Sequence, residues 1–341
     1  LQISKATRYV YVEFYIIRDD EIGNRVAEAL MAKARQGIVV RFLYDEIGSW
    51  RVSRSYLQRL SAAGVEIRPF NTRHGLANPF QLNFRNHRKM LIVDGRVSIV
   101  GGFNLGDEYA GKLSWAKHWR DTAVLLHGPI TLKIQAIFAG DYYWAARQDL
   151  READWDNSDK DQSTGMCNAS VCVTGPADLQ PRATMMFASA ALAARERLWI
   201  STPYLVPDET CLVTLTMACA RGVDVRILAP SVPDQWAVYL AGLHYEVELQ
   251  RAGIQVYRYQ AGAMHQKCIL VDDKLALLGS TNLDNRSLHL NFEVMVALEG
   301  REFVSQVATM LERDFAQSSL ARLGDRPAHP GMSILGRIVA R

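Results

Sequence analysis

Two short segments of this chain repeat one pattern of chemically active side chains. Both are H-x-K-x4-D motifs, formed by His87, Lys89 and Asp94 and by His265, Lys267 and Asp272. A G-x-x-N segment follows each motif, and the same offset of 178 residues relates the members of the two copies. Two matched copies at one offset indicate an internal duplication rather than a coincidence.

Imidazole and ammonium groups at this spacing suit phosphoryl chemistry. Side chains alternate along a strand, so His87 and Lys89 would point from one face toward a shared ligand. Lysine offers a compact cation to phosphate oxygens, and imidazole, whose pKa lies near neutrality, can act as nucleophile or proton donor. If the two copies face each other, they form a phosphoryl-transfer site that needs no metal ion and no cofactor.

The aspartates of the motifs are expected to act differently from the histidines and lysines. Asp94 and Asp272 each come five residues after the motif lysine. A strand of that length would carry the carboxylate about 16 Å away from the lysine. Although both belong to the candidate catalytic motifs, we therefore expect them to be structural.

The two halves of the chain also repeat one order of elements. The first half predicts a helix after Asp19 or Asp20 and others over 56–63 and 129–147, among strands 9–17, 38–44, 66–70, 89–95, 97–104 and 121–126. The second predicts a helix after Asp208 and another over 234–252, among strands 198–205, 223–229, 254–259, 267–272, 275–282 and 293–298. We expect two duplicated α/β lobes, each a mixed sheet flanked by helices, with the active site at their interface.

The lobe boundaries follow from composition. We place the first lobe at 1–148, a polar surface linker at 149–170, the second lobe at 171–322 and a tail at 323–341. The apolar loop 71–84 could be core or a lipid-facing lip, and the tail segment 331–341 could be core or an interfacial helix because Ile334, Leu335, Ile338 and Val339 form one stripe.

Composition limits the class of protein. With 341 residues and 49% hydrophobic content the chain can form two sizeable cores, and a net charge of +3 does not argue for nucleic acid as a partner. Five cysteines without C-x2-C spacing are expected to be free thiols. No apolar run reaches the roughly 18 residues of a membrane span. A start at Leu1, just before a strand, suggests a fragment of a longer protein.

The paired motifs resemble those of the phospholipase D superfamily, and the chain is most similar within it to bacterial cardiolipin synthases. Segments 86–89, 101–109, 201–208 and 279–287 carry that resemblance. It implies transfer of a phosphatidyl group from phosphatidylglycerol to the hydroxyl of a second phospholipid, with glycerol released and a phosphatidyl-histidine intermediate. It also implies an anionic membrane surface as partner, and a bacterial inner-membrane location with N-terminal anchoring segments outside this chain.

The resemblance extends to supporting residues. An acidic residue after each motif would orient its histidine, which assigns Asp121 to His87 and Glu293 to His265. Amide and hydroxyl groups after the motifs would hydrogen-bond the phosphoryl oxygens or support the site, and they are Asn104, Asn282 and Ser280. By analogy with the superfamily, His87 would be the nucleophile.

Three other functions use the same residues or fold. A hydrolytic phospholipase D would take water as acceptor, and a superfamily nuclease would need a more basic surface. A non-catalytic membrane-binding scaffold is the third, but it would not need intact histidine and lysine in both motifs. Oligomeric state is not predicted by the sequence.

Overall fold

The structure, a computed structural model, describes residues 2–70, 83–112, 118–156 and 167–322. The apolar loop expected at 71–84 therefore lies outside the described residues, apart from Asn83 and Phe84. The tail segment 331–341 lies wholly outside them. Both membrane-contact hypotheses stay predictions.

The first half of the chain forms one open sheet with three helices. Its strands are β1 (Tyr9–Phe14), β2 (Val39–Asp45), β3 (Glu66–Phe70), β5 (Met90–Val93), β6 (Val97–Gly101) and β8 (Ala123–His127). Its helices are α1 (Glu21–Arg35), α2 (Arg54–Ala62) and α3 (Ile130–Ala146), with 3-10 turns η1 (Ile3–Lys5) and η4 (Asp107–Ala110). The sheet order is β3-β2-β1-β5-β6-β8.

The second half repeats that arrangement. Its strands are β9 (Asn168–Thr174), β10 (Arg197–Ser201), β12 (Asp224–Pro230), β13 (Gln255–Tyr259), β15 (Cys268–Val271), β16 (Leu275–Gly279), β18 (Asn291–Glu299) and β19 (Ser318–Leu320). Its helices are α4 (Arg182–Ala193), α5 (Glu209–Ala220), α6 (Trp236–Arg251), α7 (Asn285–His289) and α8 (Arg301–Ala316). The segment β13-β12-β10-β15-β16-β18 matches the first sheet in order and in strand direction, which confirms the predicted fold of two duplicated lobes.

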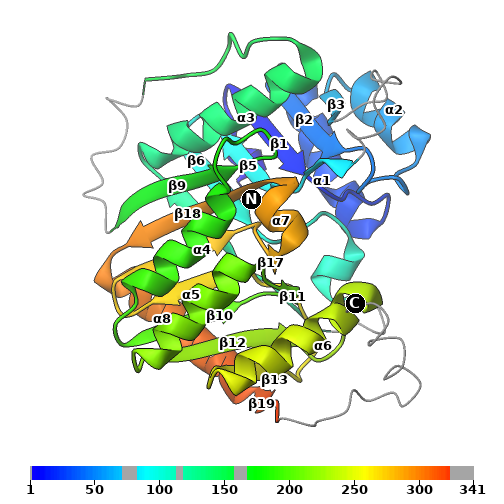
Figure 1. Ribbon diagram of the computed structural model, residues 1–341. Coiled ribbons are helices and arrows are strands. Elements are labelled where there is room, and N and C mark those ends of the chain that lie inside the picture. Colours follow the sequence, from blue (N-terminus) through cyan, green and yellow to red (C-terminus); the bar gives the residue numbers. More distant parts are fainter. Residues whose placement is uncertain (1, 71–82, 113–117, 157–166, 323–341) are drawn as a thin grey trace.

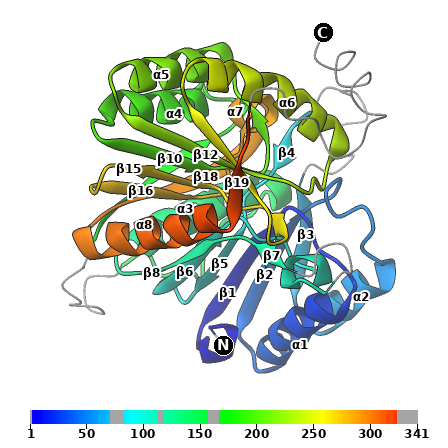
Figure 2. The same cartoon turned by 90° about the horizontal axis from the view of Figure 1, so that it is seen from below.

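The central strand of each lobe is mostly apolar because both of its faces are buried. In β1, Tyr9 and Tyr11 pack into the core between the lobes, whereas Val10 and Val12 face the core beneath α1 and α2. Trp199 and its neighbours in β10 divide in the same way between the shared core and the core beneath α4 and α5. Helices α3 and α8 contribute to the shared core, so the lobes are stacked with their inner faces together (Figure 2).

Side-chain caps fix where several helices begin. The Asp20 carboxylate accepts the Gly23 N–H at 2.9 Å at the start of α1. Asp208 accepts the Cys211 N–H at 2.8 Å at the start of α5. A carboxylate here satisfies an amide that the helix leaves unpaired and also offsets the positive end of its dipole. Both helix starts agree with the sequence prediction.

The expected linker is more ordered than its composition suggested. Strand β9 begins at Asn168, inside the range assigned to the linker, and pairs antiparallel with β18. The Glu152 carboxylate accepts hydrogen bonds from Tyr11 Oη at 2.7 Å and Arg41 Nε at 2.8 Å. Glu152 therefore ties this segment to the first lobe.

Among the described residues, five two-residue strands complete the architecture: β4 (Arg85–Asn86), β7 (Trp119–Arg120), β11 (Leu205–Val206), β14 (Ala263–Met264) and β17 (Leu283–Asp284). Strand β4 of the first lobe pairs with β18 of the second, and β14 of the second pairs with β7 of the first. In each lobe, the two residues that precede the motif histidine thus pair with a strand of the other lobe. Within the described residues, no helix is long and apolar enough to cross a bilayer.

Candidate active site

Backbone pairing between the lobes places the two motif histidines. The N–H of His87 donates to the carbonyl of Phe292 at 3.0 Å, and the N–H of His265 donates to the carbonyl of Arg120 at 2.8 Å. Both bonds continue the short inter-lobe ladders β4–β18 and β14–β7. Each histidine therefore belongs to one lobe by sequence but is held in place by the other.

This exchange reverses the predicted pairing of histidines with carboxylates. His87 Nδ1 lies 2.9 Å and 3.0 Å from the two carboxylate oxygens of Glu293. His265 Nδ1 lies 2.9 Å from Asp121 Oδ2. The expectation that Asp121 orients His87 and Glu293 orients His265 was wrong. Glu293 directly follows the residue whose carbonyl binds the N–H of His87, and Asp121 directly follows the residue whose carbonyl binds the N–H of His265.

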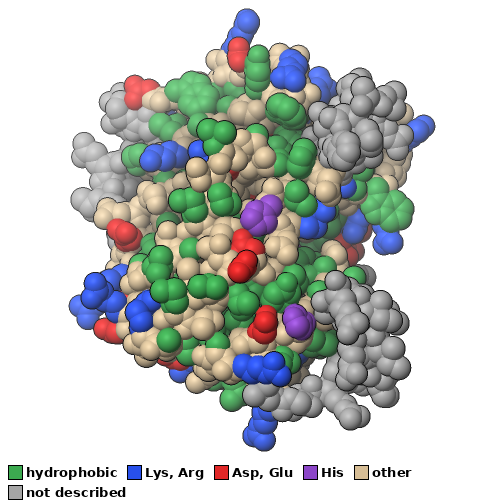
Figure 3. All heavy atoms as spheres, viewed as in Figure 1, with side chains coloured by type: hydrophobic (Ala, Val, Ile, Leu, Met, Phe, Trp, Pro, Cys, Tyr) green, Lys and Arg blue, Asp and Glu red, His purple; other side chains and the backbone are tan. Residues whose placement is uncertain are grey.

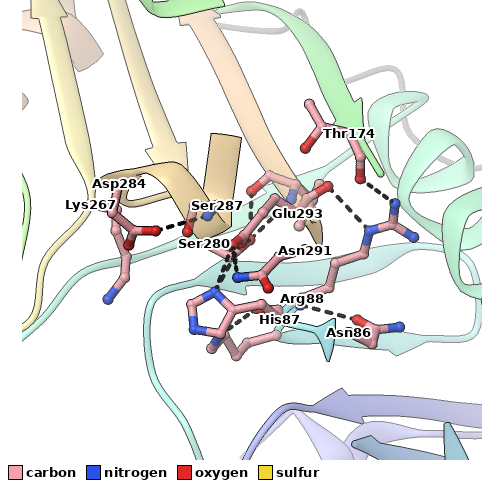
Figure 4. A network of polar contacts seen from close by, with 12 residues as sticks. Asn86, His87, Arg88, Thr174, Lys267, Ser280, Asp284, Ser287, Asn291 and Glu293 are labelled. Atoms are coloured by element: carbon pink, nitrogen blue, oxygen red, sulfur yellow. Dashed lines mark hydrogen bonds and ion pairs between the residues drawn. The ribbon is translucent and has the colours of Figure 1, made fainter. Parts of the chain in front are cut away.

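The carboxylate of Glu293 is fully buried and well supplied with donors (Figure 4). Ser280 Oγ donates to it at 2.5 Å and Asn291 Nδ2 at 3.1 Å, in addition to the imidazole. Burial would raise the pKa of Glu293, but the charge and hydrogen bond of His87 bring it below its ordinary value. Ser280, expected to bind phosphate or to support the site, thus acts as a support for Glu293.

Burial favours the neutral form of both imidazoles. It lowers the pKa of His87 to about 4, against the opposing charge of Glu293. The pKa of His265 is also lowered, first by burial and then by the charge of Lys267. A neutral ring whose Nδ1–H donates a hydrogen bond to a carboxylate keeps the Nε2 lone pair free. That lone pair can attack phosphorus or accept a proton.

His265 Nδ1 also lies 2.7 Å from the Nζ atom of Lys267. One ring nitrogen cannot donate to a carboxylate and accept from an ammonium group at once. The matching arrangement of His87 and Glu293 in the other lobe assigns the Nδ1 proton of His265 to Asp121. Lys267 Nζ donates to the backbone carbonyl of His265.

The two motif lysines are cations in a place where cations are costly. Lys89 and Lys267 are 2% and 1% exposed. Burial lowers the pKa of Lys89 well below its ordinary value and that of Lys267 to about 8. An isolated buried ammonium group is unfavourable unless an anion accompanies it, so the lysine pair favours a bound phosphate.

The shift of Lys267 predicts the alkaline limb of the activity profile. The free enzyme should lose this ammonium charge as the pH rises through about 8, and kcat/KM, which reports ionisations of the free enzyme, should fall above that pH. In the Lys267→Arg variant the guanidinium stays protonated, so its remaining activity should show no alkaline fall in that range. A variant profile that still falls at the same pH would assign the limb to another group.

Asp94 and Asp272 do not join the site, although they complete the candidate catalytic motifs. Asp94 accepts the backbone N–H groups of Thr7, Arg8 and Tyr9 at 2.8, 2.8 and 2.9 Å. Asp272 bonds in the same way to the segment that precedes β10. These bonds agree with the structural role expected from their distance, because each aspartate fastens the motif strand to the start of the central strand.

A cavity of about 390 Å³ opens between the lobes beside the histidines. The predicted residues that line it are His87, His265, Asn104 and Asn282. Other lining residues were not among the predicted site residues, and they include Tyr15, Arg85, Tyr109, Tyr204, Asp234, Asp284 and Arg286. Tyr109, Tyr204, Asp284 and Arg286 lie in the segments that carry the family resemblance, which is the signal that could have pointed to them.

The histidines differ in their surroundings even though their motifs match. The ring of Tyr15 meets the ring of His87 edge-on, with 5.0 Å between centroids. Around His265 lie the rings of Trp119 and Tyr204, with centroids 5.4 Å and 6.3 Å from that of the imidazole.

In the described part of the chain, no group of three or more His, Cys, Asp or Glu side chains is placed to hold a metal ion. The five cysteines are free thiols, as predicted.

Comparison with known proteins is consistent with this geometry. A family model described as "Cardiolipin synthase, PLD-like domain" matches residues 1–142 and 189–315. Cardiolipin synthase A of Pseudomonas fluorescens is 44% identical over 340 residues, which cover 99% of this chain and 70% of that protein. The protein of the same name from Pseudomonas aeruginosa is 44% identical over 342 residues, which cover 99% and 68%.

Solved structures share the fold at much lower identity. Phosphatidylserine synthase of Haemophilus influenzae superposes with a TM-score of 0.74 at 15% identity and covers 99% of this chain and 89% of its own. Polyphosphate kinase of Porphyromonas gingivalis gives 0.62 at 13% identity, covering 99% and 49%. At such identities the likeness shows a common two-lobed fold.

Proposed function

We infer the reaction from the premise that this chain belongs to the family of cardiolipin synthases with a phospholipase D-like domain. We propose that it is a phosphatidyltransferase that moves a phosphatidyl group from phosphatidylglycerol to the hydroxyl of a second phospholipid and releases glycerol. The observation that carries this proposal is the pair of buried histidines, His87 and His265, which line one cavity with a carboxylate behind each ring.

In the first step, Nε2 of His87 attacks the phosphorus atom and the bond from phosphorus to the glycerol oxygen breaks. A bound phosphate anion favours the protonated form of His265, which gives its proton to the departing alkoxide. In the second step, His265 takes the proton of the acceptor hydroxyl, the acceptor oxygen attacks phosphorus, and the bond to His87 breaks. Lys89, Lys267 and the amides of Asn104 and Asn282 would stabilise the phosphoryl oxygens.

Water is the competing acceptor, and product analysis separates the two reactions. Incubated with vesicles of phosphatidylglycerol, the protein is expected to form cardiolipin and glycerol, because the second lipid is present at high local concentration in the membrane. A hydrolytic phospholipase D would accumulate phosphatidic acid and glycerol instead. Phosphatidic acid as the main lipid product would reject the transferase proposal while leaving the histidine chemistry in place.

A nuclease is a weaker alternative for this surface. On the face drawn in Figure 3, the Lys and Arg side chains of the described residues are scattered among acidic and hydrophobic ones instead of forming one basic tract. The substrates proposed here carry acyl chains, so the reacting phosphate must reach the histidines from a bilayer surface. Attachment to the bacterial inner membrane by segments outside this chain stays part of the proposal.

A further inference from the structure

Two arginines line the cavity without a part in the reaction described above. Arg85 comes from β4 in the first lobe and Arg286 from α7 in the second. Arg286 donates to the side chain and the carbonyl of Asn83 at 2.9 and 2.8 Å, whereas Arg85 makes a 3.4 Å contact with the carbonyl of Phe84. Among the described residues, no carboxylate lies within ion-pair distance of either guanidinium. Both charges are therefore available to an anion.

Both guanidinium groups lie near Tyr15, a cavity residue whose ring lies beside His87. Burial and the charge of Asp45 raise the pKa of Tyr15, and the charges of Arg85 and Arg286 both oppose that rise. The Tyr15 ring in turn packs against the ring of His87. The charges of the two arginines therefore act on the same tyrosine beside His87, although the arginines come from different lobes.

The nearby carboxylate of Asp45 does not neutralise this pair. It is 1% exposed and accepts the backbone N–H groups of Ile47, Gly48 and Asn86 at 3.0, 2.8 and 3.0 Å. A carboxylate that is satisfied by three amides is held in place and cannot turn to form an ion pair. The charge of Asp45 therefore acts on Arg85 from a fixed position and without an ion pair.

The arginines also break the symmetry of the duplicated site. At the offset of 178 residues that relates the motifs, the residue that corresponds to Arg85 is Ala263, and the residue that corresponds to Arg286 is Glu108. Glu108 is itself paired with Arg18 at 3.1 Å. The residues that handle the reacting phosphate occur twice, but this cationic pair occurs once. It is therefore suited to something that only one of the two reactants presents.

We propose that Arg85 and Arg286 form a second phosphate subsite, which holds the phosphodiester of the acceptor phospholipid while its head-group hydroxyl attacks the phosphoryl group at the histidines. This inference rests on the proposed function, because water or a simple alcohol has no phosphate to bind. The exposure of the side chains fits an inner and an outer level of phosphate binding. Lys89 and Lys267 are buried beside the histidines, whereas Arg286 is exposed and Arg85 is partly exposed. Guanidinium suits the outer level because its planar fork binds phosphate oxygens in pairs.

The test compares two acceptors for one enzyme intermediate. Vesicles of phosphatidylglycerol are incubated with radiolabelled glycerol, so that the phosphatidyl group passes either to a second lipid, giving cardiolipin, or to glycerol, giving labelled phosphatidylglycerol. Arg85→Gln and Arg286→Gln should each lower the ratio of cardiolipin to labelled phosphatidylglycerol by about tenfold, because each removes a charge-assisted hydrogen bond to the acceptor phosphate. Arg301→Gln, an exposed arginine outside the cavity lining, should leave the ratio unchanged.

The ratio is internal to each sample, so partial unfolding or weaker vesicle binding lowers both products and cancels. Arg286→Lys, which keeps a charge but not the fork, should give a ratio between those of wild type and Arg286→Gln. An unchanged ratio in both Gln variants would overturn the subsite, even if total activity fell. Failure of the proposed function gives a different result, since the wild-type protein would then form phosphatidic acid in place of cardiolipin.

Discussion

Replacing either His87 or His265 with alanine is expected to reduce phosphatidyl transfer by about a thousandfold or more. One imidazole forms the bond to phosphorus and the other moves the proton, so neither can take over both tasks. The two rings lie in one cavity and have separate carboxylate partners. Cardiolipin formation from phosphatidylglycerol vesicles measures the effect, with His244→Ala as the matched control because that histidine is exposed and outside the cavity lining.

A donor with an acidic leaving group separates the two roles. A phosphatidyl ester of p-nitrophenol releases its phenolate without a proton, so it needs the nucleophile but not the acid. If His87 is the nucleophile, His265→Asn should release a stoichiometric burst of nitrophenolate and become labelled at His87, whereas His87→Asn should give no burst. The opposite pattern would exchange the roles, and near-wild-type turnover by either alanine variant would reject the shared site.

The fold was predictable from the sequence because its strongest signals are local and occur twice. The central strands are mostly apolar, since alternate residues such as Tyr11 and Val12 enter different cores. Helix starts carry capping carboxylates such as Asp208. The structural role of Asp94 followed from simple strand length. Each of these inferences needs only a few neighbouring residues.

The crossed arrangement of the site was not predictable in the same way. It depends on strands of two residues, β4 and β14, which are too short to show any period. It also depends on pairing between residues about two hundred positions apart, such as His87 with Glu293. Cavity residues such as Arg286 and Asp234 belong to the second lobe and have no matching residue in the first. Their approach to the histidines is a property of the lobe interface, which no local pattern encodes.

That crossed arrangement leads to the second large effect. Glu293→Gln and Asp121→Asn should each reduce kcat by about a hundredfold or more, because an amide can donate to Nδ1 and so favour the tautomer that carries its proton on Nε2. Both carboxylates are buried, at 0% and 7% exposure, so solvent would not replace them. Both are positioning residues that act through a histidine. Ser280→Ala, which removes one donor from Glu293 but leaves its charge, should cost much less.

Nitrogen NMR of histidine-labelled protein tests the pairing itself, apart from any loss of activity. Glu293→Gln should shift the ring resonances of His87 from the Nδ1–H toward the Nε2–H tautomer and leave those of His265 nearly in place, and Asp121→Asn should do the reverse. The two rings are assigned from the His87→Gln and His265→Gln spectra. Because each carboxylate reaches the histidine of the other motif, the effects should cross between the lobes. If Glu293→Gln perturbed His265 instead, the inter-lobe strand pairing that places both rings would be wrong, and with it the reason that a single lobe lacks a complete site.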